Sequence, residues 1–256
     1  RVTKKFNLST ITQDIVIYRS IPRIDFRTRV DWNETEKMLK AAFNVNVLSS
    51  KAVYEIQFGA IERPTHWNTS YDKAKFEVCG HKWADLSEGG YGVSLLNDSK
   101  YGYDIKDNCM RITLLRAPTD PDPDADKGIQ EMCYSLMPHA GDYREGMTVN
   151  AGYELNVPMT PIIGRSMNDE SSFAKISRSN VIIDTIKCAE DGRGLIMRVY
   201  ESNGTRGDTS INLSGLAKEV IECNLMEEDE HLLCTDSDSF EFFIKPFEIK
   251  TFRVIR

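Results

Sequence analysis

Residues 24–30 read IDFRTRV, and this stretch shows the pattern that decides the fold. Every second position carries a side chain suited to a buried face: Ile24, Phe26, Thr28 and Val30. The positions between them are charged: Arg23, Asp25, Arg27 and Arg29. Side chains of a β-strand point to opposite faces at successive residues. The alternation therefore predicts a strand with one buried face and one solvated face.

Short apolar or alternating runs continue on both sides of this strand, separated by clusters of Gly, Pro, Asn and Asp. They cover 15–17, 45–47, 53–58, 75–78, 93–96, 111–115 and 132–136. Repeated short strands of this kind predict an all-β sandwich or barrel. Residues 33–43, NETEKMLKAAF, are rich in helix formers, so either one helix or two strands joined by a turn fits them.

The composition changes near residue 175, after a polar, turn-rich stretch without apolar periodicity. Strand-like runs then resume at 180–186, 194–200, 211–213, 219–225, 240–244 and 248–255. This density of short strands resembles a small immunoglobulin-like sandwich. Asn203-Gly204 predicts a hairpin turn. We expect a large β domain over 1–175 and a small β-sandwich domain over 176–256.

Charge and length exclude several classes of protein. The 256 residues contain 39 acidic and 32 basic side chains, for a net charge of −7, which argues against a nucleic-acid partner. The apolar runs are far shorter than the roughly 20 residues that span a bilayer, so we expect no membrane partner. The first residues resemble no signal peptide, and we expect a cytoplasmic protein. They also begin without Met inside a strand-like pattern, which suggests a piece of a longer chain.

The cysteines and histidines indicate neither a disulfide framework nor a metal site. Six cysteines without a CxxC pair predict free thiols in a reducing compartment. The four histidines lack the close spacing of metal motifs: His66, His81, His139 and His231. We therefore expect no catalytic residue, no metal ligand and no cofactor within this chain.

The acidic segment at 119–131, TDPDPDADKGIQE, partly matches a calcium-binding loop. Asp120, Asp122, Asp124 and Glu131 take positions 1, 3, 5 and 12 of an EF-hand. However, Ala125 stands where the sharp turn needs Gly, and no helix flanks the segment. We interpret it as an exposed acidic turn.

Residues 62–104 concentrate Trp, Tyr and His among Gly and short polar residues. Aromatic faces beside Asp, Asn, His and Arg suit a sugar, whose C–H face packs on a ring while its hydroxyls take fixed polar partners. A structural corner that holds a buried Trp pair would produce the same pattern.

This stretch, ERPTHWNTSYDKAKFEVCGHKWADLSEGGYGVSLLNDSKYGY, resembles the C-terminal half of glycoside hydrolase family 38 (class II) α-mannosidases, in the bacterial and cytosolic-type branch. The resemblance extends over nearly the whole chain. Its other motifs are QDIVIYRSIPRIDFRTRVDW, YEIQFGAIERPTH, LLRAPTDPDPDADKG, YSLMPHAGDYRE, YELNVP, IIDTIKCAEDGRGLIMRVYESNGTRG and KPFEIKTFRV. Tyr71, Ser99 and Met137 depart from residues common in the family, on the scale of packing changes.

The resemblance implies a large supersandwich, similar to galactose mutarotase, followed by a small β-sandwich. It favours strand over helix at 33–43. Members of the family are retaining, zinc-dependent exo-α-mannosidases. Their zinc ligands and aspartate nucleophile lie in an N-terminal barrel domain that this chain does not contain. The implied partners are that catalytic domain of the same polypeptide and a mannose-containing glycan, and the isolated chain is expected to be inactive.

Candidate residues for the sugar cleft, or for the surface that faces the barrel, lie in two neighbouring loops. They are His66, Trp67, Asp85, Glu88, Gly89, Gly90 and Tyr91. We expect the loop from Asp85 to Tyr91 at the surface, where its glycines allow close approach and its carboxylates bind hydroxyls. Alternatively, Asp85 and Glu88 cap local turns. Two other functions remain open, a free-standing carbohydrate-binding module and a self-sufficient enzyme of mutarotase type.

Overall fold

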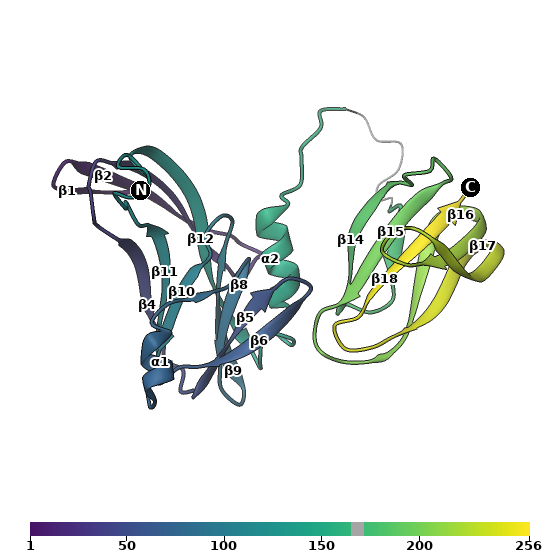
Figure 1. The fold of residues 1–256 in the computed structure, drawn as a ribbon, viewed down its shortest axis with the longest axis horizontal. Coiled ribbons are helices and arrows are strands. Elements are labelled where there is room, and N and C mark those ends of the chain that lie inside the picture. The colour runs from purple at the N-terminus through teal and green to yellow at the C-terminus, as the bar shows by residue number, and fades with distance from the viewer. Residues whose placement is uncertain (165–171) are drawn as a thin grey trace. The chain divides into compact units, whose positions relative to one another are not determined.

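The computed structural model describes residues 1–164 and 172–256, which form two compact units, Arg1–Thr160 and Pro161–Arg256 (Figure 1). The division lies before the predicted boundary at residue 175. Strand β13 (Ala174–Ile176) explains part of this difference, because it pairs with a strand of the second unit. Residues 165–171 of the polar, turn-rich stretch before residue 175 lie outside the described residues.

The first unit contains an eight-stranded sheet in the order β1-β2-β3-β12-β9-β8-β5-β6 and a four-stranded sheet in the order β4-β11-β10-β7. Neighbouring strands are antiparallel throughout. The strands are β1 (Val2–Phe6), β2 (Ser9–Ile17), β3 (Ile24–Trp32), β4 (Leu39–Asn44), β5 (Lys51–Ile56), β6 (Gly59–Pro64), β7 (Val78–Cys79), β8 (Trp83–Ser87), β9 (Tyr91–Asn97), β10 (Gly102–Lys106), β11 (Cys109–Leu115) and β12 (Gly128–Ala140).

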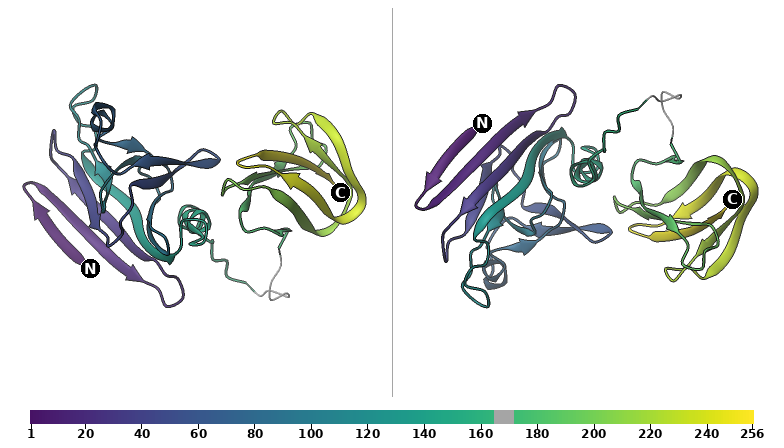
Figure 2. Two further views of the ribbon diagram at one scale, coloured as in Figure 1. Left: turned by 90° about the horizontal axis from the view of Figure 1, so that it is seen from below. Right: turned by 90° about the horizontal axis from the view of Figure 1, so that it is seen from above.

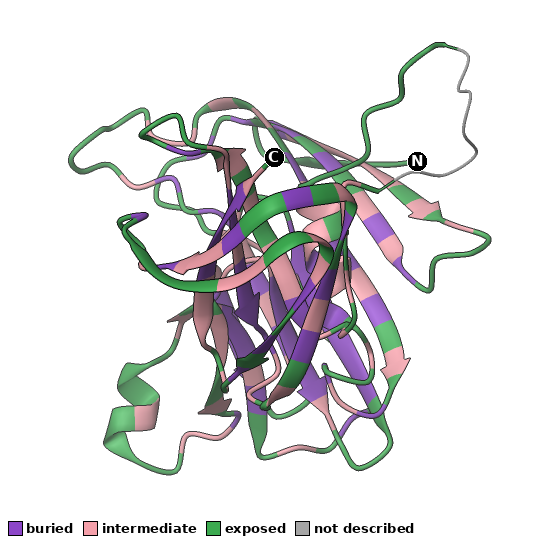
Figure 3. Ribbon diagram, turned by 90° about the vertical axis from the view of Figure 1, so that its right-hand side faces the viewer, coloured by how far each residue is buried: buried purple, intermediate pink, exposed green. Residues whose placement is uncertain are grey.

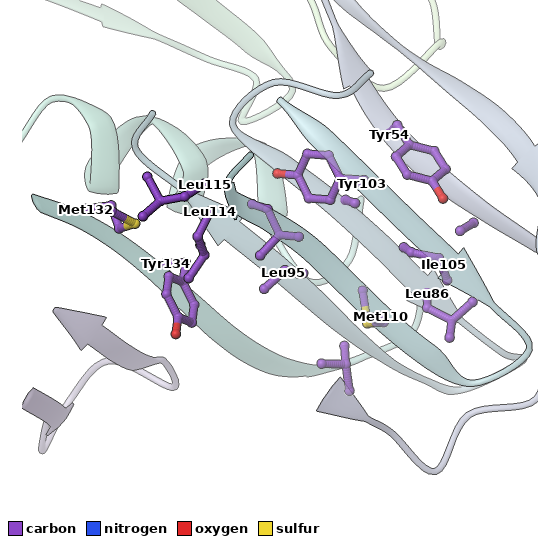
Figure 4. Packing of buried hydrophobic residues seen from close by; sticks show 14 of the residues in the cluster. Tyr54, Leu86, Leu95, Tyr103, Ile105, Met110, Leu114, Leu115, Met132 and Tyr134 are labelled. Carbon is purple, nitrogen blue, oxygen red and sulfur yellow. The ribbon is translucent and has the colours of Figure 1, made fainter. Parts of the chain in front are cut away.

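The core of this unit lies between the two sheets. Buried and exposed residues alternate along most of β3, as the sequence predicts, whereas β8 and β9 are buried on both faces (Figure 3). Side chains from both sheets form one apolar cluster, part of which Figure 4 shows: Tyr54, Leu86, Leu95, Tyr103, Ile105, Met110, Leu114, Leu115, Met132 and Tyr134. The predicted all-β supersandwich is confirmed for this unit.

The solvated face predicted for β3 is wrong in one part. Arg27 and Arg29 are exposed, but Asp25 and Arg23 are buried. Asp25 accepts hydrogen bonds from Arg23 Nε at 2.7 Å and from Ser135 Oγ at 2.7 Å. These partners replace the water that a carboxylate and a guanidinium would otherwise require.

Two helices were not predicted. Helix α1 (Ser70–Ala74) starts with a capping box between Thr69 and Asp72. Helix α2 (Thr148–Asn156) packs on β8 and β9, and Figure 2 shows this helix nearly along its axis. Residues 33–43 form no helix, because Leu39–Asn44 pair as β4 with β11. No described helix has the length and apolar character needed to cross a membrane.

The second unit forms a six-stranded arrangement in which β13-β16-β18-β15-β14 are neighbours and β17 pairs with β16. Residues 211–213 of β16 pair with β13 and residues 219–223 pair with β18, so one long strand joins these two neighbours. The predicted small β-sandwich is confirmed. Its other strands are β14 (Val181–Cys188), β15 (Leu195–Glu201), β16 (Gly207–Cys223), β17 (Asp229–Ile244) and β18 (Ile249–Ile255).

The predicted hairpin at Asn203-Gly204 is wrong, because β18 lies between β15 and β16 in the sheet. The buried carboxylate of Glu201 shapes this turn instead. It accepts hydrogen bonds from the backbone N–H groups of Asn203 at 2.9 Å, Gly204 at 2.8 Å and Phe247 at 3.1 Å. Gly204 has φ +72°, which suits glycine. A turn signal thus marks a tight loop without showing which strands it joins.

Candidate functional site

The hairpin of β8 and β9 carries most of the candidate residues. Asp85 lies on β8, Glu88, Gly89 and Gly90 form the turn, and Tyr91 begins β9. The turn closes through a hydrogen bond from Glu88 N to Tyr91 O at 2.9 Å, and Gly141 N donates to Gly90 O at 3.1 Å. The turn is therefore tied to the segment that follows β12.

Asp85 lies in the interior, 0% exposed, rather than on the surface where the sequence placed it. Its Oδ2 atom contacts His139 Nε2 at 2.7 Å and accepts a hydrogen bond from Ser94 Oγ at 2.8 Å, and Ser87 Oγ donates to Oδ1. Each oxygen of the carboxylate is thus satisfied by this chain. The expectation that Asp85 presents a free acceptor at the surface is wrong.

The hydrogen bonds around Ser94 connect the sheet to α2. A hydroxyl has a single proton to donate, and Ser94 gives it to Asp85. Towards Thr148 Oγ1, at 2.7 Å, Ser94 Oγ therefore accepts. Thr148 is the first residue of α2, so the network fastens this helix to β8, β9 and β12.

His139 fits its surroundings as a cation. Nε2 faces Asp85, and Nδ1 lies 3.2 Å from the carbonyl oxygen of Ala140, so both ring nitrogens face acceptors. Burial works against the charge, but the hydrogen bond and the charge of Asp85 outweigh it and raise the pKa of His139. Asp85 and His139 therefore form a buried ion pair within β8 and β12.

Two glycines make room for the ring of His139. A Cβ atom at Gly146 would lie 2.5 Å from His139 Cγ, and a Cβ atom at Gly92 would lie 3.0 Å from Nε2 and closer still to Cε1. Gly89 and Gly90 differ, since a Cβ atom there would meet nothing within 4 Å. The steric requirement for glycine thus lies beside the ion pair rather than in the turn.

The arrangement of Ser94, His139 and Asp85 is not a nucleophilic triad. In a triad, the carboxylate binds one ring nitrogen and the serine the other. Here both Ser94 and Asp85 face Nε2, and Ser94 is fully buried. The network can position the hairpin, but it offers no accessible nucleophile.

Glu88 and His66 line one open hollow of about 720 Å³ at an end of the first unit. The hollow lies among the loops at 46–50, 65–66 and 107–108 and the turn at Glu88. Glu88 Oε2 accepts a hydrogen bond from Leu48 N at 2.8 Å. The structure therefore brings together two of the candidates from different loops, in a rim rich in hydroxyl, amide and carboxylate groups.

Trp67 and Tyr91 lie outside the lining of this hollow. Trp67 packs under the ammonium group of Lys106, which lies 4.1 Å from the ring centroid. Tyr91 is exposed at the start of β9. Neither position establishes a contact with a sugar.

No described group of three or more His, Cys, Asp or Glu side chains is placed to hold a metal ion. In the acidic turn, Asp126 Oδ2 accepts hydrogen bonds from Arg116 N at 2.8 Å and Ala117 N at 2.9 Å. One carboxylate of this segment thus stabilises its own turn. All six cysteines are free.

The sequence interpretation missed Ser94, His139, Thr148 and Gly146 as parts of one network. Their only signal was indirect, because His139 and Gly146 lie in or beside YSLMPHAGDYRE, a motif that carries the family resemblance. Their proximity depends on the pairing of β12 with β9, in which His139 lies opposite Gly92. Residues this far apart in sequence show no local pattern.

Two family profiles match the chain. Residues 1–124 match "Glycosyl hydrolases family 38 C-terminal domain", and residues 180–252 match "Glycosyl hydrolases family 38 C-terminal beta sandwich domain". The two matched segments fall in the two different units.

Curated relatives and solved structures agree with these matches. Alpha-mannosidase G of Dictyostelium discoideum is 43% identical over 96% of this chain and 23% of its own length. Alpha-mannosidase 2C1 of Homo sapiens is 40% identical over 94% of this chain and 24% of its own length. The chain thus spans about a quarter of these relatives. The crystal structure of an alpha-mannosidase from Enterococcus faecalis V583 shares the fold, with a TM-score of 0.80 at 16% identity over 96% of this chain and 29% of that one.

Proposed function

Because the chain belongs to glycoside hydrolase family 38, as a C-terminal region of that family, we propose that it is the non-catalytic β portion of an exo-α-mannosidase that hydrolyses terminal α-mannosides. The observation that carries this proposal is the match to proteins named alpha-mannosidases along nearly the whole chain. The chain completes and braces a sugar cleft whose reactive groups, including zinc, are supplied by an N-terminal catalytic domain of the same polypeptide.

The open hollow beside Glu88 supports this role. Its rim presents Asp107 and Asn108 from the turn between β10 and β11, and His66 from the loop between β6 and α1. Such loops are usual places for binding residues, because the scaffold fixes their ends. In this proposal the Glu88 carboxylate faces the catalytic domain or a sugar hydroxyl, while its bond to Leu48 N sets its direction.

The buried pair of Asp85 and His139 supports the bracing role. It joins β8 to β12, and through Ser94 and Thr148 it also joins α2. Asp85 therefore acts as a positioning residue that holds the base of the Glu88 turn, in place of the direct sugar contact that its sequence position suggested.

The test is to assay the 256-residue chain and the complete polypeptide on an aryl α-mannoside, each with and without zinc. The proposal predicts turnover by the complete polypeptide and none by the chain alone. Zinc-dependent turnover by the chain alone would contradict it. A complete polypeptide that binds mannosides but never hydrolyses them would favour a carbohydrate-binding function over catalysis.

A further inference from the structure

A second and more enclosed cavity of about 230 Å³ lies within the first unit, beside β6, α1 and β10. Roughly 10–15 Å³ of such space holds one water molecule, so this cavity has room for a small organic ligand. The buried rings of Tyr54 and Tyr103 contribute to its lining. The hairpin of β8 and β9 contributes nothing to it.

Two polar atoms of the lining residues have no hydrogen-bond partner. Arg63 Nη1 is buried without an acceptor, and its guanidinium carbon lies 4.7 Å from the centroid of the Tyr54 ring. His66 Nδ1 is also buried without a hydrogen bond, and the nearest carboxylate oxygen, of Asp72, lies 3.8 Å away. Native structures leave few such groups unsatisfied. An oxygen atom of a ligand in the cavity would give Arg63 Nη1 an acceptor.

Aromatic side chains form the apolar part of the lining. Phe76 lines the cavity while remaining 66% exposed, so its ring is open to a ligand. Trp67 is fixed by Lys106, whose ammonium group lies over its ring. Rings beside convergent polar groups suit a molecule with one C–H face and several hydroxyls.

The charges of the lining favour a neutral ligand over an anion. Three carboxylates line the cavity and outnumber its two basic side chains: Glu62, Asp72 and Asp104 against Arg63 and Lys75. The carboxylates are held locally, for example Glu62 by Lys51 at 2.6 Å and Asp104 by Lys40 at 3.5 Å. An anion would face these carboxylates, whereas a hydroxyl can donate to a carboxylate and accept from a guanidinium group.

We propose that this cavity is a binding site for one neutral pyranose, with Arg63 donating to a ring hydroxyl and Phe76 packing on the C–H face. The inference does not depend on the catalytic role proposed above, because it concerns binding by this chain alone. His66 lines both this cavity and the open hollow, so its substitution would not separate the two sites.

The test is a titration of the isotope-labelled 256-residue chain with methyl α-mannoside, followed by NMR. The expected result is a saturable, weak interaction that shifts the Trp67 indole and Arg63 side-chain signals. Arg63→Gln and Phe76→Ala should each weaken binding by roughly tenfold or more. Because Phe76 is largely exposed, its substitution leaves the fold intact and keeps the test valid if Arg63→Gln unfolds the chain.

Tyr71→Ala is the matched control, since Tyr71 is 79% exposed on α1 and does not line the cavity. It should bind as the parent chain does. Three outcomes would overturn the proposal: no saturable shift, shifts confined to the Glu88 turn and its neighbours, or binding of glucuronate in preference to methyl mannoside. Each of these is separate from the hydrolysis assay, so failure of this site leaves the proposed function to its own test.

Discussion

The two faces of the eight-stranded sheet differ in the polar and charged groups that they bury. One face is apolar and packs on the four-stranded sheet through residues such as Leu95 and Tyr134. The other face carries Asp25, Ser94 and Asp85, which are as fully buried as the core, beside the buried apolar side chains of Trp83 and Leu96. Burial of apolar side chains is favourable by itself, whereas burial of the carboxylates on the second face is tolerated only because each has hydrogen-bond partners.

The two kinds of buried side chain differ in what they determine, because apolar contacts stabilise the fold whereas hydrogen bonds fix the positions of particular segments. Apolar contacts are non-directional and accept many substitutions of similar volume. Hydrogen bonds between Asp85, His139 and Ser94 require fixed distances, so they define where the β8–β9 hairpin and the start of α2 lie. We infer that the apolar face supplies most of the stability and the polar face fixes the Glu88 turn.

The largest effect is expected on the apolar face. Leu95→Ala should lower the free energy of unfolding of the first unit by about 3 kcal/mol, because it removes a fully buried side chain and leaves a cavity. Chemical denaturation measures this loss. Leu48→Ala, at a residue that is 89% exposed, is the control and should change stability by less than about 0.5 kcal/mol. Equal losses of stability in the two variants would show that burial on the apolar face does not supply most of the stability.

A smaller loss of stability is expected on the face that carries Asp85. Asp85→Asn keeps the shape but removes the charge beside His139, and should cost about 2 kcal/mol. The same denaturation experiment measures it. Asp31→Asn, at an exposed position of β3, is the matched control. If Asp85→Asn were as neutral as its control, the polar face would not hold the hairpin.

The glycines beside the ion pair allow a further test of how tightly the second face is packed. Gly92→Ala places a methyl group against the His139 ring, and overpacking of this kind should cost about 1.5 kcal/mol. Gly90→Ala is the matched control, because a Cβ atom there meets nothing. Thermal unfolding of the two variants distinguishes them. Similar melting temperatures would show that His139 moves aside without cost.

The apolar face could be predicted from the sequence, but the polar face could not. Alternation identified the buried side chains of β3, since apolar residues at every second position are typical of a strand with one face in the core. The same rule assigned Asp25 to solvent, although it is buried with Arg23 and Ser135. In the sequence, a charged residue on a strand gives the same pattern whether its hydrogen bonds are made with water or with a distant hydroxyl group.

The candidate site could be predicted only at the level of the segment. The Gly-containing turn and its neighbouring loop were found, and the structure brings Glu88 and His66 to one hollow. The partners of Asp85 lie 9 and 54 residues away in the sequence and meet it through strand pairing. The helix at 148–156 was missed because TVNAGYELN carries a β-branched pair and a glycine.

The smallest stability effect is a pH dependence that belongs to the polar face alone. Burial opposes the charge on His139, but Asp85 raises the pKa of His139 above the value of about 6.5 expected in the unfolded chain. Its stabilising contribution is therefore complete below pH ~6.5 and is lost as the pH rises through the folded-state pKa. The free energy of unfolding of the first unit should fall over that range.

His139→Gln should remove this part of the pH dependence. Carboxylates whose pKa is lowered, such as Asp25 and Asp72, act in the opposite sense and only near or below their usual range of about pH 4. Burial raises the pKa of Glu55, which acts in the same sense as His139, so the difference between the parent chain and His139→Gln isolates the contribution of the histidine. A pH dependence that is unchanged in His139→Gln would show that the pair is not charged in the folded state.

The most direct test of the account is the activity of the complete polypeptide with Glu88→Gln, assayed on an aryl α-mannoside. Glu131→Gln is the control, because Glu131 is an exposed carboxylate on β12 that pairs only loosely with Arg29, at 3.4 Å. If this chain completes the sugar cleft through the Glu88 turn, kcat/KM should fall by roughly tenfold or more, about 1.4 kcal/mol, while the control stays unchanged. A value of kcat/KM within about twofold of the parent enzyme would contradict the proposed role of the turn.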